Sequence, residues 1–235
     1  MKFGVAQIAL DNNISLNLDK IRHYAVEAAM TRADILCFPE CSLTGYKRDF
    51  HEINGSEIIK GLDMLQEVAK ESRIAIIVGT PYFESGKLYN AALVISTNDR
   101  FKYFKNKLTD FDEQYFAKGK GRLVFEIKGV RCGLLICRDQ NYPGLAQEYA
   151  KLGTRVIFLL AAHYYLPSEA FLKLEKNRAL PIARAVENEL FVAKANAVGS
   201  QEDYISLGHS MIVNLTGQIM CEADEKQEKL LYHEL

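Results

Sequence analysis

The chain has 235 residues, of which 49% are hydrophobic and 25% charged, a balance typical of a folded globular protein rather than a disordered or fibrous one. Its 29 basic and 30 acidic side chains give a formal net charge of -1, which argues against nucleic acid or a membrane surface as a partner. No apolar stretch reaches membrane-spanning length and no signal-peptide pattern follows Met1, so we expect a cytoplasmic protein. The five cysteines, an odd number, indicate free thiols in a reducing compartment.

Strands and helices alternate over the first third of the chain. Short runs of β-forming apolar residues predict strands at residues 3–8, 35–38 and 74–79. Between these runs, apolar side chains recur at helical spacing over residues 15–31 and 57–72. The resulting order of strand, helix, strand, helix, strand is an α/β signature.

Strands dominate the remainder of the chain. Turn residues at 97–99 and 128–129 predict hairpins, and therefore a mixed sheet. Two further helices are predicted, at 142–152 and at 168–187, the second interrupted near Pro181. So many strands with four helices fit two packed sheets with helices outside, in a single domain over residues 1–235. The remaining strands are predicted at residues 89–96, 100–104, 123–127, 130–137, 155–160, 190–196, 204–213, 218–221 and 229–233.

Cys137 is the candidate nucleophile. It ends the predicted strand at 130–137 and precedes a polar turn that leads into a helix, a position that exposes a side chain at the rim of a site. Nearby helix N–H groups would favour a thiolate and a developing oxyanion. The alternative is that Cys137 is a small buried hydrophobe, which is the role we expect of Cys37 and Cys132.

A thiol nucleophile needs a base and an electrophilic stabiliser. Among the five histidines, His163 follows a strand and could face a pocket, but a histidine at a strand end is more often a hydrogen-bonded structural residue. Glutamate replaces histidine as base where burial raises its pKa, and lysine supplies positive charge for an oxyanion. Glu40 and Lys105 each follow a predicted strand, so the two strand ends offer such a pair. The alternative is that each charge, taken singly, is solvated or ion-paired, which is the more common case.

The sequence contains no recognisable motif for binding a metal or a phosphate group. Cys37 and Cys41 are not followed by a second Cys/His pair at zinc-like spacing. No Walker lysine loop is present, and no G-x-G-x-x-G segment opens a helix. We therefore expect neither a metal nor an organic cofactor.

Three segments occur together in a characteristic order and spacing. They are Phe38-Pro39-Glu40 with the following Leu43-Thr44-Gly45-Tyr46, then Tyr103-x-Lys105-x-x-Leu108, then Gly133-x-x-Ile136-Cys137-x-Asp139-x-x-Tyr142-Pro143. Glu113-x-x-Phe116-x-x-Gly119 and Asn196-x-x-Gly199 extend the pattern over nearly the whole chain. The set resembles the signature of the nitrilase superfamily of carbon–nitrogen hydrolases.

The resemblance implies a four-layer α-β-β-α sandwich and a catalytic triad of Glu40, Lys105 and Cys137. Cys137 would attack an amide-type carbon to form a thioester, while Glu40 would transfer the protons and Lys105 would hold the oxyanion with the backbone N–H of Arg138. Glu113 matches the family's second glutamate, which would orient Lys105 or the substrate; the alternative is a plain surface glutamate.

The resemblance makes small linear amides, either aliphatic amides or ω-amides of dicarboxylic acids, the expected small-molecule substrates. N-carbamoyl amines come next and nitriles last. Arg138 would either bind a substrate carboxylate or enter a structural ion pair, and Tyr46 and His163 are further candidate pocket residues with core or surface roles as the alternative. An acyltransferase that uses the same thioester and a catalytically silent binding protein remain open. The resemblance also implies a homodimer or a higher homo-oligomer.

Overall fold

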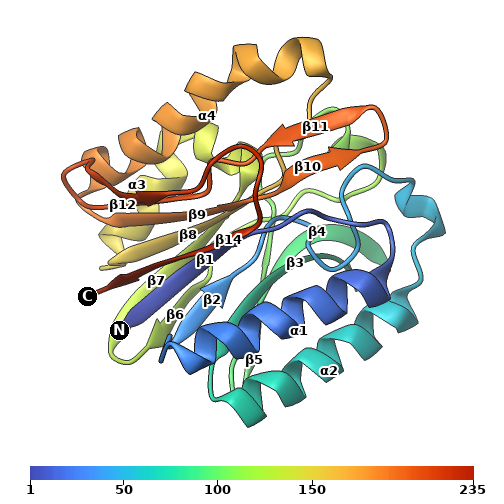
Figure 1. The fold of residues 1–235 in the computed structure, drawn as a ribbon, viewed down its shortest axis with the longest axis horizontal. Helices are drawn as coiled ribbons and strands as arrows, with labels where there is room; N and C mark the ends of the chain where they lie inside the picture. The colour runs from blue at the N-terminus through green and yellow to red at the C-terminus, as the bar shows by residue number, and fades with distance from the viewer.

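The computed structural model describes residues 1–235 and contains two packed β-sheets with helices on both outer faces (Figure 1). The helices are α1 (Ile14–Met30), α2 (Gly55–Ser72), α3 (Pro143–Lys151) and α4 (Pro167–Asn188). Short 3-10 helices, η1 (Phe50–Glu52), η2 (Asp112–Gln114) and η3 (Cys137–Asn141), lie in the loops. None of the helices has both the length and the apolar composition needed to cross a bilayer.

The first sheet is built mainly from the N-terminal half of the chain. Its strands are β1 (Lys2–Gln7), β2 (Ile35–Cys37), β3 (Ala75–Glu84), β4 (Lys87–Ile95), β5 (Arg100–Phe104) and β14 (Lys229–Glu234). They follow the order β14-β1-β2-β3-β4-β5, in which β1, β2 and β3 are parallel and the other pairings antiparallel. Because β14 pairs with β1, Lys2 faces Glu234 and the two chain ends lie side by side (Figure 1).

The second sheet comes from the C-terminal half of the chain. Its strands are β6 (Val124–Ile127), β7 (Val130–Ile136), β8 (Val156–Ala161), β9 (Phe191–Asn196), β12 (Met211–Val213) and β13 (Ile219–Glu222). They follow the order β13-β12-β9-β8-β7-β6, with β7, β8 and β9 parallel. A separate hairpin joins β10 (Val198–Gln201) to β11 (Tyr204–Leu207). Parallel neighbours place their carboxyl ends at one edge, where ligand sites of α/β folds gather.

Three apolar cores separate the four layers. The central core lies between the sheets, where Phe3 and Phe158 meet edge to face at 5.9 Å. A second core packs α1 and α2 on the first sheet through side chains such as Ile21 and Leu62, and a third packs α3 on the second sheet through Tyr149. The predicted four-layer α-β-β-α sandwich is therefore confirmed.

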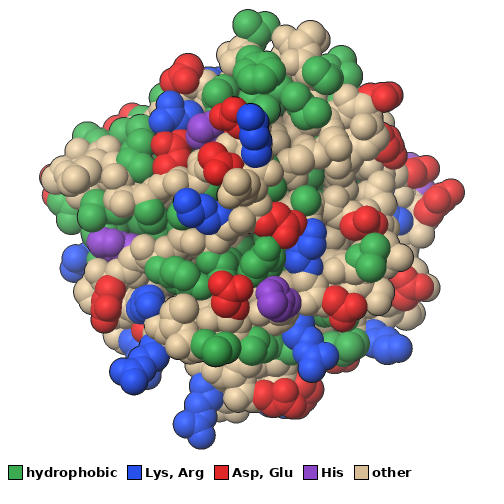
Figure 2. Space-filling model, in the orientation of Figure 1, with side chains coloured by type: hydrophobic (Ala, Val, Ile, Leu, Met, Phe, Trp, Pro, Cys, Tyr) green, Lys and Arg blue, Asp and Glu red, His purple; other side chains and the backbone are tan.

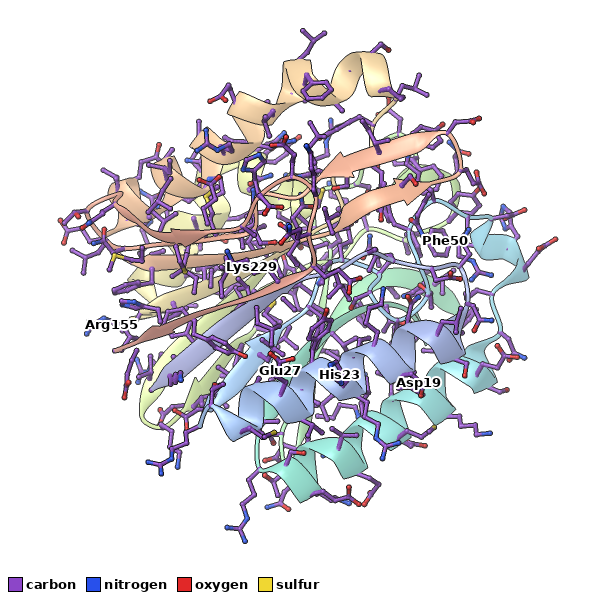
Figure 3. All side chains as sticks on the ribbon, viewed as in Figure 1. Asp19, His23, Glu27, Phe50, Arg155 and Lys229 are labelled. Atoms are coloured by element: carbon purple, nitrogen blue, oxygen red, sulfur yellow. The ribbon has the colours of Figure 1, made fainter.

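The outer helices are amphipathic, as α1 illustrates. Ile21 and Ala25 are fully buried against the sheet. Asp19, His23 and Glu27 lie one turn apart along the exposed side of the helix (Figure 3). The spacing that predicted this helix from the sequence therefore also determines which side faces the core.

The segment predicted as one strand at residues 204–213 is broken in two. Gly208 and His209 have φ values of 60° and 55°, which no strand residue adopts, and the chain bends there between β11 and β12. A Cβ on Gly208 would lie 2.6 Å from the carbonyl oxygen of Asp224, so only glycine fits at this bend. The hairpin partner β10 was not predicted from the sequence.

Helix α4 continues through Pro181 instead of being interrupted there. Proline lacks the N–H that would bond to the carbonyl four residues earlier, which belongs to Asn177. Nζ of Lys194, on β9, donates to that carbonyl oxygen at 3.2 Å. A side chain of the neighbouring sheet thus replaces the missing helix donor.

Candidate active site

Glu40 lies just beyond the carboxyl end of β2, where the chain folds back against β3. Gly79 of β3 permits this approach, because a Cβ at that position would lie 2.5 Å from the carbonyl oxygen of Pro39 and from the backbone nitrogen of Cys41. The side chain of Glu40 is completely buried. Its Oε2 accepts a hydrogen bond from the backbone N–H of Ala162 at 3.1 Å, which links the ends of the two sheets.

Lys105 directly follows β5, and its ammonium joins two carboxylates. Its Nζ lies 2.6 Å from Oε1 of Glu40 and 2.7 Å from Oδ2 of Asp112. Asn90 of β4 donates through Nδ2 to Oε1 of Glu40 at 2.8 Å and to Oδ1 of Asp112 at 3.3 Å. The hydroxyl of Tyr46 donates to Oδ1 of Asp112 at 3.2 Å. These groups form a buried network that keeps the two carboxylates and the ammonium paired.

The acidic partner of Lys105 besides Glu40 is Asp112, not Glu113. Glu113 is exposed and makes no hydrogen bond or ion pair to Lys105, so the expectation that it orients Lys105 is corrected. Asp112 is fully buried, and its Oδ2 also accepts from the backbone N–H and the hydroxyl of Thr109 at 2.9 and 2.8 Å. The one-residue difference arises because η2 turns Asp112 inward and its neighbour outward.

Cys137 lies where β7 enters η3 and is 8% exposed. Its φ of 45° is unusual for a residue with a side chain, and such backbone strain persists where the surroundings enforce it. Asp139 enforces it here, since its Oδ2 accepts from the backbone N–H of Ile136 at 3.0 Å and from the hydroxyl of Tyr103 at 2.8 Å. Its Oδ1 accepts from the backbone N–H of Lys107 at 2.8 Å. Asp139 thereby ties the cysteine turn to the segment that carries Lys105.

Burial and charge set the protonation of the three central groups. Burial raises the pKa of Glu40 above its ordinary value, although the Lys105 ammonium opposes the rise. Burial works against the charge of Lys105, but Glu40, Tyr46 and Asp112 together hold its pKa well above the ordinary value. Burial, reinforced by the Glu40 carboxylate, raises the pKa of the Cys137 thiol. The cysteine is therefore a thiol at neutral pH, with a carboxylate of raised basicity beside it.

A cavity of about 460 Å³ opens over Cys137. Tyr46, Arg138 and His163 all line it. The side chain of Arg138 makes no ion pair or hydrogen bond. His163 is buried, and burial lowers its pKa well below the ordinary value, so its ring is neutral at physiological pH. Its backbone N–H donates to Oδ1 of Asn196 at 3.1 Å.

The structure thus brings together most of the residues selected from the sequence. Glu40, Lys105 and Cys137 converge, and their mutual effects on pKa follow from this proximity. Asp112 and Asp139 were missed as site residues. Asp139 stands within the cysteine signature, so its spacing from Cys137 was an available signal. Asp112 had no signal of its own, because two neighbouring acids in a loop carry no period that tells which one points inward.

Known proteins with similar sequences or structures are named as amidases. A family model described as carbon–nitrogen hydrolase matches residues 2–235. The 2-oxoglutaramate amidase of Bacillus subtilis is 26% identical over 97% of this chain and 88% of its own length. The omega-amidase NIT2 of Homo sapiens is 29% identical over the whole chain and 88% of its own length. A crystal structure of an amidase from Nesterenkonia sp. has a TM-score of 0.90 at 24% identity, covering 100% of this chain and 90% of that one.

The fold, the strand-end cluster and the family model together define a class of enzyme. The chain belongs to the carbon–nitrogen hydrolase family, whose model matches residues 2–235. The similarity predicted from the signature segments is thereby confirmed.

Proposed function

We propose that this chain hydrolyses a small linear amide through a thioester on Cys137, with Glu40 as general base and acid and Lys105 as electrostatic stabiliser. The observation that carries the proposal is the fully buried Glu40–Lys105 pair beside Cys137 at the end of β7. Buried charges are expensive, and here they surround a protonated thiol at the foot of a cavity, an arrangement suited to nucleophilic catalysis.

In the first half of the reaction, Oε of Glu40 accepts the thiol proton as Sγ of Cys137 attacks the amide carbon. The carbonyl oxygen becomes an oxyanion, which the Lys105 ammonium and the backbone N–H of Arg138 stabilise. Glu40 then passes the proton to the departing nitrogen. The carbon–nitrogen bond breaks, ammonia leaves and the acyl group remains on Cys137 as a thioester.

In the second half, water replaces ammonia. Glu40 removes a proton from the water as its oxygen attacks the thioester carbon, and the same two donors stabilise the second oxyanion. The carbon–sulfur bond breaks, the acid is released, and the proton held by Glu40 returns to Sγ of Cys137. Asp112 keeps Lys105 charged and fixed throughout.

An ω-amide is the favoured substrate. The matched relatives are named 2-oxoglutaramate amidase and omega-amidase. An ω-amide of a dicarboxylic acid carries a carboxylate at the end opposite the amide. The cavity supports the same choice, because it is lined by four basic side chains and two acidic ones. The basic residues are Lys47, Arg138, Lys173 and Lys176, and the acidic residues are Asp110 and Glu169. A net positive cavity favours an anionic amide over a neutral one.

Ammonia release tests the proposal directly. Wild-type protein is incubated with ω-amides, aliphatic amides, N-carbamoyl amines and nitriles, beside Cys137→Ala and the matched control Cys132→Ala on the preceding strand, β7. We expect turnover of ω-amides that disappears in Cys137→Ala and persists in Cys132→Ala. Activity retained by Cys137→Ala contradicts the proposal. Added hydroxylamine separates hydrolysis from acyl transfer, since a transferase would form the hydroxamate in preference to the acid.

We further propose a single-domain cytoplasmic enzyme that assembles as a homodimer. All five cysteines are free, which suits a reducing compartment. The N-terminal end of α4 leaves Phe171 and Leu172 65% and 83% exposed, with Leu166 beside them. Figure 2 shows apolar side chains gathered over this end of the helix. Such a patch supports association between copies, which sedimentation velocity would measure.

A further inference from the structure

Lys47 stands out among the basic residues of the cavity because aromatic rings surround its ammonium. Its Nζ lies 4.1 Å from the ring centroid of Tyr204, 4.5 Å from that of Phe111 and 5.6 Å from that of Tyr46. It makes no ion pair and no side-chain hydrogen bond. Cation–π contacts stabilise an ammonium without neutralising it, so its charge stays available to a ligand.

The backbone around Lys47 is fixed. Oε1 of Gln201, on β10, accepts hydrogen bonds from the backbone N–H groups of Tyr46 and Lys47 at 3.1 and 3.0 Å. The preceding Gly45 has a φ of 78°, and a Cβ there would lie 2.7 Å from Nε2 of Gln201. The loop that carries Lys47 is therefore held against the β10–β11 hairpin, which also supplies Tyr204.

The same elements hold Lys47 and the reaction centre. Nζ of Lys105 lies 5.8 Å from the centroid of the Tyr46 ring, and Nζ of Lys47 lies 5.6 Å from it, so both amines contact one aromatic side chain. Consecutive residues, Phe111 and Asp112, contact Lys47 and Lys105 respectively. Tyr46, Phe111 and Asp112 thus fix the position of Lys47 relative to the reaction centre.

The other basic side chains of the cavity differ from Lys47 in their surroundings. Lys173 is paired with Glu169 at 3.2 Å. Lys176 is exposed and has no aromatic contact. Arg138 is half-buried and unpaired, but it contacts no ring that would hold its guanidinium in place. Lys47 alone combines partial burial, a fixed position and an unpaired charge.

We propose that Lys47 binds the carboxylate at the far end of the substrate while the amide carbon lies at Sγ of Cys137, and that it thereby selects ω-amides over neutral amides. This inference rests on the function proposed above. The aromatic cage preorganises the ammonium, so little side-chain freedom is lost when the carboxylate binds. A neutral amide would leave the caged ammonium without its counterion and would gain nothing from it.

The test compares an acidic and a neutral amide of similar size, succinamate and butyramide, and measures kcat/KM for each. Lys47→Met keeps the length and the apolar stem of the side chain but removes its charge. We expect the ratio of kcat/KM for succinamate over that for butyramide to fall by about 100-fold, as for loss of a charge-assisted hydrogen bond. Lys47→Arg should restore part of the ratio. Lys151→Met, which removes an exposed lysine of α3 outside the cavity, should leave the ratio near that of wild type.

Each remaining outcome decides against the inference. A Lys47→Met protein that hydrolyses butyramide and keeps the wild-type ratio would show that Lys47 does not bind the carboxylate. A ratio that falls in Arg138→Gln but not in Lys47→Met would assign the carboxylate to Arg138 instead. Wild-type protein that hydrolyses butyramide but does not prefer succinamate would reject the inference while keeping the hydrolase. Inactivity of the wild type on every amide would reject the proposed function itself.

Discussion

Two lysines, Lys105 and Lys194, are fully buried in this molecule, and they respond to burial in opposite ways. The ammonium of Lys105 is held between Glu40 and Asp112, and these neighbours keep its pKa well above the ordinary value. The amine of Lys194 forms no ion pair and donates one hydrogen bond, to the carbonyl oxygen of Asn177. Burial lowers its pKa from 10.5 to about 7. Burial alone does not determine the charge of a lysine; the carboxylates beside it do.

The contrast also separates function from structure. The Lys105 cluster places three charged groups beside Cys137, at the end of the sheet where the cavity opens. Lys194 points away from the central core, into the layer between the second sheet and α4, where it contacts Asn177. One region concentrates charge for chemistry, and the other tolerates a polar group because the helix leaves one carbonyl unpaired.

Replacement of Lys105 by methionine should have the largest effect. Without the ammonium, Glu40 and Asp112 become two buried carboxylates facing each other, so we expect the free energy of unfolding to fall by about 4 kcal/mol at pH 7. Hydrolysis should fall by about 10⁴-fold because the oxyanion loses its cation. Urea denaturation and ammonia release measure the two effects. Unchanged stability would mean that Lys105 does not compensate the carboxylates.

Replacement of Lys194 by methionine should act in the opposite direction. Methionine fills similar space without the cost of a buried amine, so we expect a gain in the free energy of unfolding on the order of 3 kcal/mol at pH 7. Because folding lowers the pKa of Lys194, the unfolded chain binds more protons than the folded chain between about pH 7 and 10.5. The cost of Lys194 is therefore largest below about pH 7 and disappears as the pH rises towards 10.5.

The stability gain of Lys194→Met should accordingly shrink by about 1.4 kcal/mol per pH unit above neutrality. Urea denaturation of wild type and variant at several pH values measures this slope. The matched control is Lys176→Met, since Lys176 lies on α4 but is exposed, and its effect should be small and independent of pH in this range. A gain that does not vary with pH would show that Lys194 is not neutralised by burial.

The second carboxylate of the Lys105 cluster gives a smaller effect on activity. Asp112→Asn removes a charge bound to Lys105 at 2.7 Å, so we expect kcat/KM to fall by about 100-fold because Lys105 is no longer held in position. Glu113→Gln is the matched control, since Glu113 is adjacent but exposed, and it should stay close to wild type. Equal losses in both variants would contradict the assignment of this role to Asp112.

The sequence predicted much of this architecture because the relevant signals are local. Alternating apolar runs and amphipathic periods predicted the layers, and Glu40, Lys105 and Cys137 each stand at a strand end within a signature segment. The local sequence does not reveal which of two adjacent side chains points into the core. Asp112 and Glu113 differ only through the turn of η2, which depends on contacts with Lys105 and Thr109.

Lys194 and Pro181 were unpredictable for the same reason. Lys194 stands inside an apolar strand, where its position predicts burial but not a partner. Pro181 signals a helix break, because the sequence does not reveal a donor from another element for the carbonyl of Asn177. A buried lysine in a strand and a proline inside a helix are each unusual on local grounds. The hydrogen bond from Lys194 of β9 to the carbonyl of Asn177 in α4 makes both possible.

The coupling of these two residues gives the smallest and most specific prediction. In wild type, an alanine at position 181 would bring a backbone N–H to the carbonyl of Asn177, which already accepts from Lys194. In the Lys194→Met background that carbonyl has lost its donor. The change in the free energy of unfolding caused by Pro181→Ala should therefore be more favourable in that background by about 1 kcal/mol, the net value of one hydrogen bond. The cavity left by the buried proline ring is common to both backgrounds and cancels in a double-mutant cycle. Additive effects of the two substitutions would show that Lys194 and the carbonyl do not act as a pair.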